Sequence, residues 1–210
     1  MINNQLIIDE REVGKTTYLY TEAVKCKSMG LPLFILDSAT EHVEKSLLKK
    51  FIKTFPDSIV SDMREVNNVV LGKLSLEEFV MNYQNFYPFN EIMQSLKKTM
   101  CFDLSFFLEK GHEIYELTGE IKGYRYYRNL YNLLAQQIIL VLMLMEKEKI
   151  INKDCMVILD EIEFPKTDYN IADFQNNISF LGAVHPENAF GTFYQSFDKI
   201  NSLVYRRRKD

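Results

Sequence analysis

Short apolar runs that alternate with helical segments constrain the fold of this chain more than any other feature. Residues Gln5 to Ile8 and Leu33 to Leu36 are apolar runs that end next to acidic residues. Helical periodicity follows each run, over Lys15 to Met29 and over Glu41 to Phe55. A continuously apolar strand is typical of a parallel sheet that is buried on both faces. The first third of the chain is therefore predicted to be α/β.

Strand character returns only near the C-terminus, over Met156 to Leu159, Ile178 to Val184 and Ile200 to Tyr205. Between these two parts, residues 63–150 show helical patterns rich in Phe, Tyr and Met and no clear strand. The helices expected there cover residues 75–83, 90–98, 102–117 and 124–149. We therefore predict one domain over residues 1–210, with five strands and with 63–150 as a helical insertion.

Composition excludes several classes of protein. The 210 residues are 47% hydrophobic and carry a net charge of −4, which excludes a disordered chain and argues against broad electrostatic capture of nucleic acid. Residues 123–131 interleave tyrosines with arginines and leave a nucleic-acid contact open, although the favoured interpretation is a helix with buried tyrosines and exposed arginines.

The cellular setting is expected to be the cytoplasm. The three cysteines are far apart and form no CxxC pair, which indicates reduced thiols. The N-terminus has no basic segment followed by a long apolar core, as a secretory signal would have. The longest apolar run, Ile138 to Met145, is too short for a membrane span and predicts a buried helix.

The first segment that carries chemistry runs from Leu6 to Thr17. A predicted strand enters a loop, and Gly14-Lys15-Thr16 then starts a helix, so that backbone amides and the helix dipole favour an anion there. The segment resembles the Walker A motif of P-loop nucleoside triphosphatases. The resemblance assigns nucleotide binding to the following residues: Val13, Gly14, Lys15, Thr16 and Thr17. Lys15 is expected to reach the terminal phosphates and Thr16 to ligate Mg²⁺.

A second segment, Cys155 to Glu161, has four apolar residues followed by two acids and resembles a Walker B strand. By this resemblance, Asp160 holds the metal shell and Glu161 orients the attacking water. The alternative is an ordinary strand that ends in solvated acids. Both segments need the same parallel sheet, so each supports the other.

A third segment follows the same scheme. The strand that ends at Val184 is followed by His185-Pro186, where the additional-strand division of P-loop ATPases carries a polar sensor of the γ-phosphate. His185 occupies that place by order, and an ordinary loop histidine remains the alternative. From Leu181 to Arg207 the order of elements resembles the C-terminal part of FtsK- and HerA-like ATPases.

Together these resemblances imply a P-loop NTPase-type parallel sheet flanked by helices. In chain order, the five strands are expected in the sheet order 5-1-4-3-2, with the helical insertion between the second strand and the Walker B-like strand. The expected function is ATP binding with Mg²⁺ and hydrolysis that moves the insertion or a partner. Lys15, Glu161 and His185 are the expected catalytic residues, and Thr16 and Asp160 the expected metal ligands.

Two other functions stay open. The first glycine of the Walker A motif is replaced by Asp9, and the acidic residues Glu10 and Glu12 would repel a triphosphate. These departures motivate a degenerate P-loop protein that acts as an interaction module without productive hydrolysis. The other alternative is a kinase in which Glu161 is the base for an acceptor hydroxyl. A protein partner and self-association are both compatible with the sequence.

Overall fold

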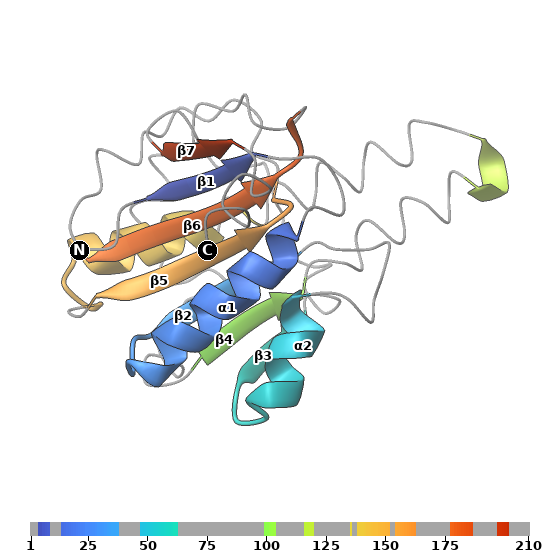
Figure 1. The fold of residues 1–210 in the computed structure, drawn as a ribbon. Coiled ribbons are helices and arrows are strands. Elements are labelled where there is room, and N and C mark those ends of the chain that lie inside the picture. The colour runs from blue at the N-terminus through green and yellow to red at the C-terminus, as the bar shows by residue number, and fades with distance from the viewer. Residues whose placement is uncertain are drawn as a thin grey trace, which may run out of the picture.

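Within the described residues, seven strands form one sheet in which every neighbouring pair is parallel (Figure 1). The computed structural model of the chain describes residues 4–8, 14–37, 47–62, 99–103, 116–119, 135, 138–151, 154–162, 177–186 and 197–201. The strands are β1 (Gln5–Ile8), β2 (Leu33–Asp37), β3 (Ile59–Asp62), β4 (Thr99–Asp103), β5 (Cys155–Asp160), β6 (Ile178–Val184) and β7 (Asp198–Asn201). Their order across the sheet is β3-β4-β2-β5-β6-β1-β7.

The predicted α/β class is confirmed, and so is the order of the expected strands. The five strands expected from the sequence correspond to β1, β2, β5, β6 and β7, and they stand in the expected order β7-β1-β6-β5-β2. β6 therefore separates β1 from β5. β7 begins at Asp198, two residues before the predicted start.

The predicted strand count and the purely helical nature of residues 63–150 are both wrong. β3 was not expected, and β4 lies inside the predicted insertion, where Phe102 was taken as the start of a helix. β4 forms because it pairs with β2 on one side and with β3 on the other, which buries Met100 and Cys101 completely. The predicted helices over 75–83 and 90–98, and residues 104–115 of the third, lie outside the described residues.

The helix α1 (Lys15–Ser28) follows β1 and begins and ends with glycines in the left-handed region. At its C-terminus the Leu31 amide donates to the Cys26 carbonyl at 3.1 Å, and the Gly30 amide to the Lys27 carbonyl at 3.0 Å. This pair of hydrogen bonds is a Schellman motif, in which glycine supplies the positive φ, here 71°. The predicted end of the helix at Gly30 follows from this geometry.

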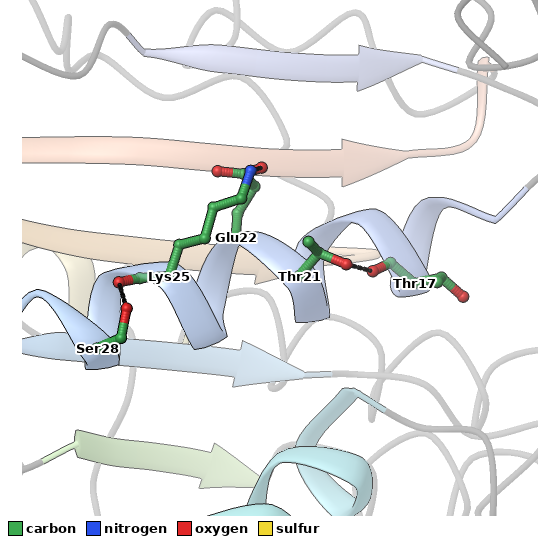
Figure 2. Close-up of polar contacts among 5 residues, drawn as sticks. All are labelled: Thr17, Thr21, Glu22, Lys25 and Ser28. Carbon is green, nitrogen blue, oxygen red and sulfur yellow. Dashed lines mark hydrogen bonds and ion pairs between the residues drawn. The ribbon is translucent and has the colours of Figure 1, made fainter. Parts of the chain in front are cut away.

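One side of α1 is polar and the other is buried. Figure 2 shows the polar side, where the Thr21 hydroxyl donates to the Thr17 carbonyl at 3.0 Å and Lys25 pairs with Glu22. The buried side carries Leu19, Ala23 and Cys26, which pack on the sheet. Because its apolar and polar residues lie on opposite sides, α1 packs on one face of the sheet, over β5 and β6 (Figure 1).

The helix α2 (Leu47–Thr54) packs beside α1 on the same face of the sheet. The Tyr20 and Thr54 hydroxyls share a hydrogen bond of 2.8 Å between the two helices. α2 occupies the second half of the predicted helix over Glu41 to Phe55, whose first residues are not described. Both helices contribute to one apolar cluster with the sheet, which contains Ile7, Leu19, Ala23, Cys26, Leu33, Ile35, Leu47, Leu48, Phe51, Cys101, Met156, Ile158, Leu181 and Ala183.

Residues 138–147 are helical and lie on the opposite face of the sheet from α1 and α2 (Figure 1). Every residue from Ile138 to Met145 is at most 5% exposed, so the prediction of a buried helix there is confirmed. Among the described residues, no helix is long and apolar enough to cross a lipid bilayer. Helices on both faces explain why all residues of β2 and β5 are buried.

The three cysteines are free and buried, as the sequence predicted. Burial raises the pKa of the Cys101 thiol and of the Cys155 thiol to about 12 in each case. Both thiols are therefore protonated at neutral pH and belong to the packing of the sheet rather than to a reactive centre.

Leu19 on the buried side of α1 gives a test of this packing. Leu19→Ala leaves a cavity against the sheet, so we expect it to lower the free energy of unfolding by about 2–5 kcal/mol. Thr21→Ala, on the exposed side of the same helix, should change it by less than about 0.5 kcal/mol. Urea unfolding followed by circular dichroism measures both, and equal effects of the two substitutions would contradict this seating of α1.

Candidate functional site

The carboxyl ends of four central strands meet at one edge of the sheet. Ile8 at the end of β1 is the register partner of Val184 in β6, and Asp160 at the end of β5 is the partner of Ala183. Asp37 at the end of β2 is in turn the partner of Asp160. Because ligands of open α/β sheets bind outside the carboxyl ends of the strands, this edge is the natural place for a site.

Asp37 and Asp160 lie on the same face of the sheet as α1. Successive residues of a strand point to opposite faces, so residues two apart share a face. The residues two and four positions before these aspartates belong to the apolar cluster under α1: Leu33 and Ile35 in β2, and Met156 and Ile158 in β5. The same alternation brings both carboxyl groups to the side where α1 begins.

The N-terminus of α1 is built to receive a negative charge. Gly14, its N-cap residue, has φ 92°, a conformation that a residue with a Cβ adopts only under strain. Gly14 has no side chain with which to cap the helix, and the first turn contains no acidic residue. The amides of this first turn and the helix dipole therefore favour an anion from outside the helix.

Lys15, the first residue of α1, reaches across to β5 and β6. Its side chain is 6% exposed, and its Nζ lies 2.9 Å from Glu161 Oε1 and 3.5 Å from the carbonyl oxygen of Val184. These two contacts compensate an ammonium group that has lost most of its hydration. The amine of the Walker A-like segment and the acid of the Walker B-like segment are thus in direct contact.

Glu161 connects three elements. It follows β5 with φ 56°, in the left-handed region that residues other than glycine rarely adopt. Its amide donates to the Ala183 carbonyl at 2.9 Å, and its Oε2 accepts a hydrogen bond from the His185 amide at 3.2 Å. With Oε1 on Lys15, both carboxylate oxygens are engaged, yet the side chain remains 34% exposed.

Asp160 is completely buried beside this pair. Burial raises the pKa of its carboxyl group well above the ordinary value, and the negative charges of Asp37 and then Glu161 raise it further. The nearby Thr16 hydroxyl and the positive charge of Lys15 lower the pKa and so act in the opposite direction. The carboxyl group therefore keeps its proton at a pH where an exposed aspartate has lost it.

Asp37 is a site residue that the sequence analysis did not single out. It is 3% exposed, and its Oδ2 accepts a hydrogen bond from the Leu48 amide at 2.9 Å, which fixes the start of α2. The signal that pointed to Asp160, a strand that ends in aspartate, also occurs at Asp37. Strands β4 and β3 also end in aspartate, at Asp103 and Asp62. Asp103 is the register partner of Asp37, and Asp62 is the register partner of Asp103.

The structure brings together most of the site residues that the sequence predicted. Gly14, Lys15 and Thr16 at the start of α1 meet Asp160 and Glu161, and the His185 amide joins them. Thr17 has an exposed side chain on the polar side of α1 (Figure 2). The predicted binding residue Val13, the acidic loop residues Asp9, Glu10 and Glu12, and the aromatic and basic segment 123–131 lie outside the described residues.

The oxygen donors at this edge suit a hard cation, for which they would supply only part of the coordination shell. Thr16 and Asp160 offer a hydroxyl and a carboxylate oxygen, the kind of ligand that Mg²⁺ prefers. Across the described ranges, no group of three or more His, Cys, Asp or Glu residues is placed to hold a metal ion alone. The residues fit a cation whose shell is completed by phosphate oxygens and water.

Comparisons with known proteins leave the family open. No protein-family model matches the chain, and neither the curated proteins nor the solved structures contain a match.

The raised pKa of Asp160 predicts how stability depends on pH. The pKa of Asp160 in the folded chain lies above its ordinary value of 3.8. The contribution of this group to stability is therefore fully present below pH 3.8 and is lost as the pH rises through the folded-state pKa. The loss has a limiting slope of about 1.4 kcal/mol per pH unit. Asparagine at this position does not titrate. We therefore expect Asp160→Asn to raise the free energy of unfolding relative to the wild type, and to raise it more at pH 8 than at pH 5.

Thermal unfolding between pH 4 and pH 9 measures this effect. Asp57→Asn is the matched control, because Asp57 is 63% exposed and pairs with Lys27 on the surface. The control should follow the wild-type profile. A profile of Asp160→Asn that runs parallel to the wild type would show that Asp160 is not the group that titrates.

Proposed function

We propose that this chain binds ATP with Mg²⁺ at the carboxyl edge of the sheet and hydrolyses the bond to the γ-phosphate. The observation that carries the proposal is the proximity of four side chains at this edge: Lys15, Thr16, Asp160 and Glu161. Two distant segments, each with its own resemblance to a nucleotide-binding motif, contribute to this one cluster. A strand that merely ended in solvated acids would leave Asp160 exposed, whereas it is completely buried.

The phosphates are received by the start of α1. Backbone amides of the first turn point out of the helix, and Gly14 allows the chain to turn sharply before Lys15. The Lys15 ammonium adds a compact positive charge next to the end of β6. Together they hold the triphosphate with its terminal group near Glu161 and His185.

Thr16 and Asp160 are the oxygen donors that would hold the cation. When bound, Mg²⁺ neutralises charge on the phosphate oxygens. Asp160 needs to lose its proton to act as a ligand, and Lys15 and the Thr16 hydroxyl favour that ionised form. Asp37 stays on the Leu48 amide and acts on Asp160 through its charge.

Glu161 is the general base in this proposal. A water molecule attacks the γ-phosphorus, its proton passes to the Glu161 carboxylate, and the bond to the ADP oxygen breaks. The His185 amide keeps one carboxylate oxygen in place while the other faces the reaction. His185 follows the end of β6 directly, so its side chain is the candidate sensor of the γ-phosphate.

One observation favours the alternative of a degenerate P-loop module. The Lys15 amine is already paired with Glu161 inside the chain, so a nucleotide has to compete with an internal anion. If a triphosphate does not displace Glu161 from Lys15, the ion pair stabilises the fold and the site binds no triphosphate. Nucleotide binding by the wild-type protein decides between the two functions.

Isothermal titration with Mg-ATP tests the proposed function. We expect binding by the wild type at or below millimolar concentration, and Lys15→Ala should weaken it by about 100-fold, since it removes a charge-assisted contact to phosphate. Lys25→Ala is the control, because Lys25 lies on the polar side of the same helix and pairs with Glu22. Absence of wild-type binding at millimolar nucleotide would leave the interaction module as the function.

Glu161→Gln tests the catalytic role. Glutamine is similar in size but does not take up a proton, so phosphate release from Mg-ATP should fall by about 100- to 10,000-fold. Binding of a non-hydrolysable ATP analogue should be retained. Normal phosphate release by this variant would show that Glu161 is not the base.

A further inference from the structure

We propose that Glu161 has a second role, as an internal anion that holds Lys15 in the nucleotide-free chain and is displaced by the incoming phosphates. The Glu161 carboxylate then becomes available as a base only when a nucleotide is bound. This inference rests on the proposed function and adds to it a control of the empty site. The geometry that carries it is the contact of 2.9 Å between Lys15 Nζ and Glu161 Oε1.

Lys15 needs an anion in the empty site. Its side chain is 6% exposed, and the Val184 carbonyl at 3.5 Å is a distant neutral acceptor. A buried ammonium without a nearby negative charge is strongly destabilising. Glu161 supplies that charge, and it does so at the place where a phosphate oxygen has to bind if Lys15 contacts the nucleotide.

Glu161 stays anchored when it releases Lys15. Its amide remains on the Ala183 carbonyl and its Oε2 on the His185 amide, and neither contact involves Lys15. Its side chain is 34% exposed and is therefore accessible to water. Loss of the Lys15 contact frees Oε1 while the carboxylate keeps its position beside β6.

The backbone of Glu161 supports a positioning role of this kind. A φ of 56° is unfavourable for glutamate and persists only where surrounding contacts impose it. Here the contacts to Ala183 in β6, to His185 directly after β6 and to Lys15 in α1 impose it. The strained residue therefore lies where α1, β5 and β6 meet, and a ligand on Lys15 acts directly on the contacts of its Oε1.

Competition between Glu161 and phosphate has a measurable consequence. A carboxylate on Lys15 has to be displaced before the amine reaches a phosphate, and its charge repels the triphosphate. Glu161→Gln removes the charge and most of the competition. The variant should therefore bind a non-hydrolysable ATP analogue with Mg²⁺ about 10-fold more tightly than the wild type, although it does not turn over ATP.

The experiment is isothermal titration of the imido analogue of ATP and of ADP, with MgCl₂, into wild type and Glu161→Gln. Neither ligand is hydrolysed, so tighter binding does not reflect trapped substrate. Glu146→Gln is the control, because Glu146 is buried on the far helix and accepts a hydrogen bond from Asn177 at 3.2 Å. It should bind within 2-fold of the wild type.

Thermal unfolding provides a second readout. Without nucleotide, Glu161→Gln should unfold at a lower temperature than the wild type, because Lys15 has lost its anion, and the analogue should raise its unfolding temperature by more. If the glutamine variant does not fold, Glu161→Asn replaces it, since asparagine is neutral and tolerates positive φ.

The outcomes separate the two proposals. Equal or weaker analogue binding by Glu161→Gln, with normal wild-type binding, overturns the role of Glu161 as a competing anion and leaves the proposed function intact. No analogue binding by wild type or variant overturns both. Tighter binding by Glu146→Gln as well would show a general charge effect and would also overturn the specific role of Glu161.

Discussion

The parallel pairing of the strands is the constraint on which the site depends. Helices cover both faces of the sheet, and β2 and β5 are buried along their whole length, so charged groups are accommodated mainly at the strand ends. Parallel pairing places all the carboxyl ends on one edge. Asp37 and Asp160 are therefore brought together by the same register that aligns the apolar residues before them. The chemistry at the edge is a consequence of how the core is packed.

The charges at this edge do not balance within the described part of the chain, and that imbalance shapes the site. Lys15 is the ammonium group in contact with Glu161, while Asp160 lies beside them and feels the charge of Asp37. Without a further cation, protonation of Asp160 is the least costly way to bury that carboxyl group. In the proposed function, a divalent cation supplies the missing positive charge when the edge binds a polyanion.

The sequence predicted the parts of the fold that follow from local pattern, and it failed where pairing decides. β1, β2, β5 and β6 are apolar runs beside helices or turns, and their patterns were sufficient. β4 directly follows Lys97-Lys98 and has no clear apolar run, and it becomes a strand because β2 and β3 flank it. Asp37 was missed for a related reason: a strand that ends in aspartate is common, and only the register with Asp160 distinguishes this one.

The conformation and contacts of Glu161 could not be predicted from the sequence. Its identity as the acid after Asp160 was predictable, but its left-handed backbone and its contact with Lys15 depend on β6 lying beside β5. That backbone costs about 1–2 kcal/mol, which a single hydrogen bond to the Ala183 carbonyl offsets only in part. The carboxylate contacts to Lys15 and to the His185 amide supply the rest. A ligand that draws Lys15 away therefore removes one of these contacts, while the contacts to Ala183 and to the His185 amide keep the acid in place. Occupancy of the amine and availability of the acid are thus coupled through one residue.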